Sequence, residues 1–153
     1  MSRQKITPCL WFDGKAEEAA TYYVSIFPDS AITDVTPGPN GAALVVSFRL
    51  AGLQYLALNG GPYFQFNEAI SLSIDCQSQA EVDELWEKLS SGGSKGQCGW
   101  LKDKYGLSWQ VVPSVLSQLL SDPDRAKTAR VIEAMMGMTK LDIQVLRNAA
   151  DEK

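Results

Sequence analysis

The sequence predicts an α+β fold that consists of two diverged copies of one strand–helix–strand unit, followed by a helical C-terminal tail. Three observations lead to this class. A strand pattern followed at once by a helix pattern occurs twice along the chain. Similar residues recur at fixed offsets between the two occurrences, which is typical of an internal repeat. After Pro113 the strand patterns end and apolar residues return at helical spacing.

The first copy opens with a strand at Ile6–Phe12, which is predicted from a mostly apolar run. Asp13 is expected to cap the helix that follows, because a carboxylate there accepts hydrogen bonds from the first helical amides. Apolar side chains recur at helical spacing between Ala16 and Ile26, and Pro28 ends this pattern. A strand that leads directly into a helix is therefore expected.

The second copy repeats this order, with a strand at Ile70–Cys76 and then a helix. Ser78 and Glu81 form a capping box, in which each side chain accepts a hydrogen bond from a backbone amide at the start of the helix. Gly92-Gly93 ends the helix. One buried helix face is predicted from four residues: Val82, Leu85, Trp86 and Leu89.

Each copy continues into β-rich sequence. Tight turns at Ala51-Gly52 and Tyr105-Gly106 are expected to join paired strands. The strands are predicted at Ala43–Leu50, Leu53–Leu58, Cys98–Lys102 and Leu107–Val112. The matched pairs that support the repeat are Ile6/Ile70, Leu10/Ile74, Ala16/Ala80, Glu17/Glu81, Tyr22/Trp86, Gly52/Gly106 and Tyr55/Trp109. Residues 1–113 are thus expected to form one domain from modules at about 5–61 and 68–113, with residues 114–153 as a helical extension.

The tail is predicted to hold two further helices that cover a sheet or a partner subunit. Asp122-Pro123 is interpreted as an N-cap with proline at the first helical position, and Gly137 as the end of that helix. A last short helix is expected from Thr139 to about Ala149. The buried stripe of the first tail helix is predicted at Ala126, Ala129, Ile132 and Met136.

Composition excludes several classes of protein. The chain has 153 residues, of which 45% are hydrophobic and 21% charged, values that are typical of a globular domain. The net charge is −4 and no basic block occurs, so a nucleic-acid partner is not expected. No apolar run is long enough to span a membrane, and the first residues lack the apolar core of a secretory signal. We therefore expect a soluble, cytoplasmic protein without a membrane partner.

The absence of histidine from the sequence restricts the possible chemistry. It excludes histidine general bases, histidine-dependent catalytic triads and metal sites with histidine ligands. The three cysteines, Cys9, Cys76 and Cys98, form no CxxC pair and are odd in number, so no disulfide framework is expected. They are interpreted as buried small hydrophobic residues, with reactive thiols as the alternative.

Three motifs resemble the PhnB-like branch of the vicinal oxygen chelate superfamily, which includes glyoxalases and bleomycin-resistance proteins. This branch often carries a demethylubiquinone methyltransferase name. The resemblance is expected to cover nearly the whole chain, including the Asp122–Leu146 tail, and implies paired βαβββ modules whose sheets curl around a cavity. It also implies a homodimer in which modules can be exchanged. The motifs are Ile6–Gly14 with Ala16–Ala19, Ala57–Pro62, and Cys98–Asp103 with Tyr105–Pro113.

The resemblance also implies a divalent metal that is held by two histidines and two glutamates, which this sequence does not support. No histidine is present, and the matching positions on the closing strands are Leu56 and Gln110. Leucine cannot bind a metal, and an amide oxygen is a weak, neutral ligand. The Asn59–Pro62 stretch does not lead into a helix, so it is interpreted as a linker and not as an S-adenosylmethionine loop. We expect neither a metal nor a cofactor.

Strand alternation separates pocket candidates from core candidates. Leu56 and Gln110 are expected to face the cavity, while Tyr55 and Trp109 pack beneath the helices. Cys98 and Trp100 share one side of a strand, as do Cys9 and Trp11, and the sequence leaves open whether these pairs line the cavity or the core.

Two further features outside these strands are pocket candidates. Glu68 is either a general base in an apolar cup or a solvated charge. Tyr63, Phe64 and Phe66 form an aromatic cluster that is expected to cap the pocket or contact a partner subunit.

The leading functional hypothesis is a metal-free member of this superfamily that binds a small, partly apolar or aromatic molecule in its sheet cavity. One alternative is an enzyme of the lyase, dioxygenase or methyltransferase type with unusual ligands. Another is an interaction protein that uses its tail and aromatic residues for assembly. A homodimer is expected, since two short sheets leave open edges that favour pairing.

Overall fold

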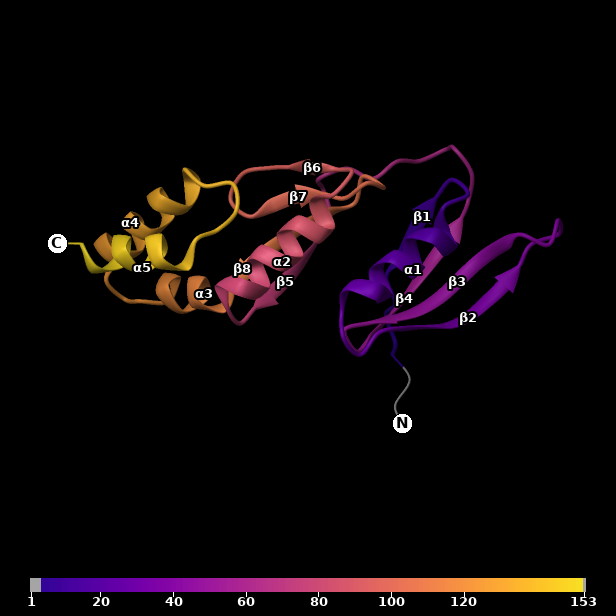
Figure 1. Cartoon of the computed structure of the whole chain (residues 1–153), viewed down its shortest axis with the longest axis horizontal. Coiled ribbons are helices and arrows are strands. Elements are labelled where there is room, and N and C mark those ends of the chain that lie inside the picture. The colour runs from indigo at the N-terminus through magenta and orange to yellow at the C-terminus, as the bar shows by residue number, and fades with distance from the viewer. Residues whose placement is uncertain (1–3, 153) are drawn as a thin grey trace. The chain divides into compact units, whose positions relative to one another are not determined.

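Each sequence copy forms its own four-stranded mixed sheet in a computed structural model that describes residues 4–152 (Figure 1). Residues 1–3 and 153, at the ends of the predicted domain and tail, lie outside the described residues. The chain divides into two compact units, with the boundary between Phe66 and Asn67. We describe each unit separately.

The first unit has the order strand, helix, three strands. The first strand pairs in parallel with the last, and the remaining neighbours are antiparallel, which gives the sheet order β1-β4-β3-β2. The unpredicted strand is β2, most of which is exposed at the edge of the sheet. The elements are β1 (Cys9–Phe12), α1 (Ala16–Ile26), β2 (Ala31–Pro37), β3 (Ala43–Leu50) and β4 (Leu53–Asn59).

The second unit repeats this topology in the order β5-β8-β7-β6, again with its first and last strands parallel. The predicted duplication and α+β class are therefore confirmed. The strand that corresponds to β2 is reduced to two residues, which accounts for the shorter second copy. The elements are β5 (Ser71–Cys76), α2 (Gln79–Ser90), β6 (Ser94–Lys95), β7 (Trp100–Lys102), β8 (Ser108–Pro113), α3 (Ser114–Leu120), α4 (Arg125–Met136) and α5 (Ile143–Asp151).

Helix α1 lies close to its sheet because its inward face carries small residues. Ala16, Ala19 and Ala20 are fully buried, and Tyr23 is buried beside them. The predicted cap at Asp13 is wrong, since the N-cap position is Lys15 and its side chain makes no capping bond. The side-chain oxygen of Asn59 at the end of β4 instead accepts a hydrogen bond from the amide of Ala16, at 2.9 Å.

Helix α2 begins as the capping box predicts. The Ser78 hydroxyl accepts a hydrogen bond from the Glu81 amide at 3.1 Å, and the Glu81 carboxylate accepts one from the Gln77 amide at 2.8 Å. These bonds satisfy amides that have no partner within the helix. The predicted inward face is also confirmed, because Val82, Leu85, Trp86 and Leu89 are all buried.

The turns between paired strands follow the predicted positions. Ala51 and Gly52 both have positive φ, at 48° and 86°, which matches the right-handed twist of a two-residue hairpin. The predicted strand at Cys98–Lys102 is shorter than expected and starts at Trp100. The reason is that Cys98 and Gly99 adopt φ values of 58° and 83°, which an extended strand does not allow.

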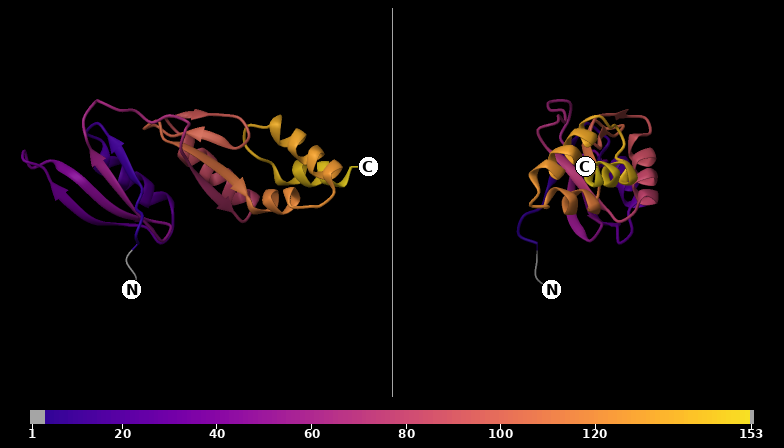
Figure 2. Two further views of the ribbon diagram at one scale, coloured as in Figure 1. Left: turned by 180° about the vertical axis from the view of Figure 1, so that it is seen from behind. Right: turned by 90° about the vertical axis from the view of Figure 1, so that its left-hand side faces the viewer.

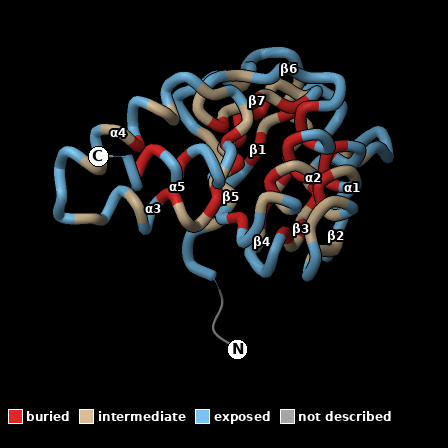
Figure 3. The backbone as a smooth tube through the Cα atoms, turned by 60° about the vertical axis from the view of Figure 1, so that its left-hand side comes forward, coloured by how far each residue is buried: buried red, intermediate tan, exposed pale blue. Residues whose placement is uncertain are grey.

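The C-terminal helices pack around a small hydrophobic cluster within the second unit, and Figure 2 shows them gathered at one end of that unit. The predicted buried stripe of α4 is wrong. Ile132 and Met136 are 44% and 62% exposed, whereas Val131 is fully buried. Figure 3 shows short buried stretches among exposed ones in helices α3, α4 and α5. The cluster that selects this face consists of Leu116, Val131, Leu141, Leu146 and Ala150.

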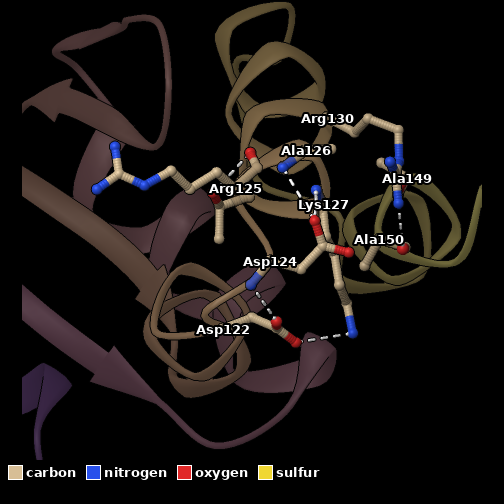
Figure 4. A network of polar contacts seen from close by, with 9 residues as sticks. Asp122, Asp124, Arg125, Ala126, Lys127, Arg130, Ala149 and Ala150 are labelled. Carbon is tan, nitrogen blue, oxygen red and sulfur yellow. Dashed lines mark hydrogen bonds and ion pairs between the residues drawn. The ribbon is translucent and has the colours of Figure 1, made fainter.

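The helix boundaries of the tail also differ from the prediction (Figure 4). Asp124 caps α4 in place of Asp122, because its carboxylate accepts hydrogen bonds from the amides of Ala126 and Lys127. Asp122 lies two residues before this cap, and its carboxylate pairs with Lys127 at 3.0 Å. The last helix begins at Ile143, so the expected start at Thr139 is wrong.

None of the helices among residues 4–152 is both long and apolar enough to cross a membrane.

Candidate functional site

The second unit carries a groove on the sheet face that points away from α2. Trp109 and Val111 of β8 are buried on the opposite side, so alternation places Gln110 and Val112 on the groove side. The groove has a volume of about 310 Å³. Its lining residues come from the sheet, from the loop before β7 and from helices α3 and α4: Ser73, Cys98, Trp100, Gln110, Val112, Leu116, Ser117, Leu120 and Met135.

Strand register fixes the polar part of the groove. Gln110 lies between Ser73 of β5 and Trp100 of β7, its direct partners in the two flanking strands. Its amide nitrogen donates to the hydroxyl of Ser71 at 3.0 Å. This bond orients the amide, so the groove presents an amide and the Ser73 hydroxyl beside an indole ring.

Cys98 and Trp100 lie in the same groove, although Cys98 precedes the strand. Two backbone hydrogen bonds of 2.8 Å hold the loop, from Cys98 to the carbonyl of Met138 and from Gly99 to that of Thr139. The Cys98 thiol lies 3.9 Å from the sulfur of Met136. The loop therefore directs a thiol toward the end of α4.

Glu68 lies at a smaller, separate hollow of about 130 Å³, which Lys102, Ser108 and Trp100 also line. It is exposed and ion-paired with Lys102. The hydrogen bond from Lys102, together with a backbone hydrogen bond and the charge of Lys102, lowers the pKa of Glu68 below its ordinary value. An apolar cup would instead raise the pKa of a carboxyl. The surroundings of Glu68 are therefore those of a solvated charge and not those of a general base in an apolar cup. The hydroxyl of Ser108 is buried in this region and has no hydrogen-bond partner among the described residues.

The candidate residues of the first unit lie on the sheet face opposite α1. Leu10 and Phe12 are buried toward the helix, which places Cys9 and Trp11 on the other side, and Cys9 is the register partner of Leu56. The Trp11 indole donates to the carbonyl of Gly61 at 2.9 Å.

The segment that follows β4 covers part of Trp11. A Cβ on Gly60 would lie 2.3 Å from the Trp11 ring, so only glycine permits this close approach. Phe64 packs edge-on against Trp11 at 4.9 Å between ring centroids, and Phe66 packs against Phe12 at 5.4 Å. Tyr63 and Phe64 remain 76% and 66% exposed.

Tyr55 and Trp109 lie beneath the helices, as predicted. Tyr55 stacks on Phe48 with ring centroids 5.5 Å apart, and both rings are buried in the first unit. The Trp109 indole donates to the carboxylate of Asp103 at 2.8 Å in the core of the second unit. Tyr55 and Trp109 therefore pack on the helix-facing side of their sheets, opposite the candidate pocket residues.

The cysteines differ in their surroundings. Cys76 is fully buried, and burial, with smaller contributions from Glu81 and Asp75, raises the pKa of its thiol to about 12. Cys9 is exposed and Cys98 is half-buried, so the interpretation of all three as buried hydrophobic residues is right for Cys76 alone.

The residues do not fit the metal centre of the vicinal oxygen chelate superfamily. Leu56 has no donor atom, and Gln110 offers a single neutral amide oxygen, with its NH₂ group directed at the Ser71 hydroxyl. Among the described residues, no three side chains of His, Cys, Asp or Glu come together in a way that could hold an ion.

Sequence reasoning missed several residues of the groove. Ser73, which lines the groove, and Ser71, which accepts the Gln110 hydrogen bond, could have been found from alternation along the predicted strand at Ile70–Cys76. Leu116, Leu120 and Met135 gave no such signal, because they reach the groove through the packing of α3 and α4.

Comparison with known proteins gives a family match and several similar structures. Residues 4–112 match the family described as 3-demethylubiquinone-9 3-methyltransferase, so the tail, which was expected to share the resemblance, lies outside the match. No match was found among curated proteins.

Three solved structures illustrate the similarity. A PhnB protein from Bacillus cereus, which carries a 3-demethylubiquinone-9 3-methyltransferase name, is 33% identical over 72% of this chain and 99% of its own, with a TM-score of 0.68. A Pseudomonas aeruginosa protein is 21% identical over 72% of this chain and 98% of its own, with a TM-score of 0.59. The fosfomycin resistance protein FosX from Listeria monocytogenes, in complex with Mn(II) and sulfate, is 18% identical over 71% of this chain and 90% of its own, with a TM-score of 0.55.

Proposed function

The chain belongs to the 3-demethylubiquinone-9 3-methyltransferase family of PhnB-like proteins, and from this premise we propose that it binds a small, partly apolar or aromatic molecule without the superfamily's metal centre. The groove of the second unit is the proposed binding site. The observation that carries the proposal is the combination of an indole wall, an oriented amide and a hydroxyl in one concave site.

The size and lining of the groove favour a small ligand. A volume of about 310 Å³ is at the lower end of the range of small-molecule sites, which are mostly apolar with a few polar groups. Trp100 offers a flat surface on which an aromatic ring stacks. Gln110 can donate to and accept from a neutral polar group, so it gives orientation and not catalysis.

The proposal that the protein works without the superfamily's metal rests on the donor set. FosX binds Mn(II). The resemblance implies that Leu56 and Gln110 stand at the matching closing-strand positions of this chain, and histidine is absent from the sequence. A protein of this fold that keeps its concave sheet but lacks metal ligands can still sequester a molecule through shape and hydrogen bonds.

The family name also suggests a second function, methyl transfer. A doubly wound sheet with a glycine-rich loop that opens a helix is the usual way to hold S-adenosylmethionine. Here Asn59-Gly60-Gly61-Pro62 follows β4 and leads into a segment that is not helical. We therefore favour binding over methyl transfer.

A thermal-shift screen with a panel of metabolites and antibiotics tests the proposal. A ligand at one hundred times its Kd stabilises the protein by about 2.7 kcal/mol, which corresponds to a shift of roughly 5–11 °C for a protein of this size. Trp100→Ala and Gln110→Leu should reduce the shift, whereas Gln118→Leu, an exposed control on α3, should not.

Two outcomes would contradict the proposal. One is the absence of a shift with every compound of the panel. The other is stoichiometric uptake of a divalent metal or of S-adenosylmethionine in calorimetry, which would favour the enzyme alternative.

A further inference from the structure

A short row of polar side chains crosses the sheet of the second unit at the hollow beside Trp100. Ser108 of β8 is the direct register partner of Lys102 of β7, and Lys102 is in turn the partner of Ser94 of β6. Side chains of directly paired residues point to the same side of a sheet. Ser108 precedes Gln110 by two positions, so the row lies on the same face as the groove. All three side chains line the hollow, which therefore presents two hydroxyls and one ammonium group.

The Ser108 hydroxyl is the buried member of this row. Ser108 is 1% exposed, and its hydroxyl has no hydrogen-bond partner among residues 4–152. A buried hydroxyl without a partner has lost its hydrogen bonds to water and gained none in return, which costs stability. Since Ser108 lines the hollow, a ligand that enters there can complete its hydrogen bonding.

Glu68 already places one carboxylate on Lys102. The two side chains form an ion pair, and Glu68 is 60% and Lys102 42% exposed. An exposed ion pair contributes little to stability, because water solvates both charges well. A second carboxylate can therefore replace that of Glu68 on Lys102 at low cost. The contact within the chain also shows that a carboxylate can reach Lys102 at the hollow.

We propose that this hollow binds the carboxylate of a short monocarboxylic acid, in competition with the side chain of Glu68. In the bound state the Lys102 ammonium group supplies the opposite charge, and the Ser108 hydroxyl donates a hydrogen bond to a carboxylate oxygen. The Glu68 side chain then turns to solvent. The site shares only Trp100 with the groove, goes beyond the proposed small-molecule function and does not depend on it.

The size and charge of the hollow select a short, singly charged acid. Its volume is about 130 Å³. Liquid water occupies about 30 Å³ per molecule, so there is room for roughly four groups of that size. A carboxylate with a short apolar tail fits this space, and the tail can pack against the Trp100 indole. Among the described residues that line the hollow, Lys102 is the single cation, which matches one carboxylate better than the higher charge of phosphate.

NMR titration of the ¹⁵N-labelled full chain with propionate tests this site. We expect saturable shifts in the signals of Trp100, Lys102 and Ser108, with one propionate bound per chain. Lys102→Met should abolish binding, because it removes the opposite charge. Ser108→Ala should weaken binding by roughly tenfold or more, because a hydrogen bond to a charged group is lost. This variant should fold normally, since the hydroxyl that it removes has no partner among the described residues.

Glu68→Gln separates competition from a purely structural ion pair. It removes the internal carboxylate and should therefore strengthen propionate binding, whereas a residue that only supports the hollow would weaken binding when replaced. The matched controls, Lys95→Met and Glu87→Gln, belong to an ion pair of 3.1 Å on the other face of the sheet. Lys95 is there because its register partner is the buried Leu101. Neither control should change the affinity for propionate.

Four results would overturn the proposal. The first is the absence of saturable shifts with propionate, and the second is an equal response to the neutral analogue propionamide. The third is an unchanged affinity in Lys102→Met, or a lower affinity in Glu68→Gln. The fourth is tighter binding of inorganic phosphate than of propionate, which would contradict the assignment of a monocarboxylate.

Discussion

Asp103 is a buried carboxylate that holds the turn between β7 and β8, and its replacement by asparagine gives a quantitative test of this role. It is 2% exposed. One carboxylate oxygen accepts hydrogen bonds from the amides of Tyr105 and Leu107, at 2.8 and 3.1 Å, and the other accepts from the Trp109 indole at 2.8 Å. Three donors from the turn and the core thus converge on a single side chain.

Asparagine has the same shape but only one oxygen. If that oxygen serves the two amides, the side-chain NH₂ group faces the Trp109 N–H, so two donors oppose each other. Leaving a buried donor unsatisfied costs about 1–3 kcal/mol, and the loss of charge weakens the other two bonds. We therefore expect Asp103→Asn to lower the free energy of unfolding by about 2–4 kcal/mol, or the melting temperature by roughly 5–15 °C.

Urea denaturation followed by tryptophan fluorescence measures this loss well, because three of the four tryptophans, Trp86, Trp100 and Trp109, belong to the second unit. Asp34→Asn is the matched control. Asp34 is exposed on β2, so its replacement should change the stability by no more than about 0.5 kcal/mol. A loss of less than about 1 kcal/mol for Asp103→Asn would refute the role assigned to this carboxylate.

Three further predictions concern other parts of the chain. Burial raises the pKa of Cys76 from 9.0 to about 12. The free energy of unfolding should therefore be unaffected below pH 9 and should fall above it by up to about 1.4 kcal/mol per pH unit, because only the unfolded chain loses this proton there. Urea titrations at several pH values should show a flatter slope for Cys76→Ala. Arg130→Met should lower the free energy of unfolding by about 1–3 kcal/mol and speed hydrogen exchange in α5, because the guanidinium donates to two carbonyls at the end of that helix (Figure 4). The control Arg125→Met, at the exposed start of α4, should change neither quantity. Light scattering should give the mass of a homodimer, and a monomer at all concentrations tested would contradict the expected pairing of open sheet edges.

Helix caps and tight turns that involve only a few adjacent residues could be predicted from the sequence. The capping box at Ser78 and Glu81 and the turn at Ala51-Gly52 need only a few adjacent positions, and both are present. The cap of α1 could not be predicted in this way. The capping oxygen belongs to Asn59 at the end of β4, and only the pairing of β1 with β4 brings this acceptor to the first amide of the helix.

Longer-range packing also decided the parts of the site that the sequence missed. Alternation along β8 separated Gln110 from Trp109, because one strand carries both residues. The orientation of α4 depends on which of its faces packs against the hydrophobic cluster of Leu116, Leu141 and Leu146. Val131 is buried there and Ile132 is exposed, although both are apolar and adjacent in sequence. For the same reason, the contribution of Met135 to the groove has no signature in the sequence.

The parallel pairing of first and last strands affects how the nascent chain acquires its structure. In each unit the sheet is incomplete until its final strand has been synthesised, because the first strand pairs with the last. This pairing closes a long loop, which slows folding. The first sheet uses nothing beyond Asn59, which leaves the ribosome before any strand of the second sheet. The strands of the first unit can therefore pair during translation, before the strands of the second unit have been synthesised.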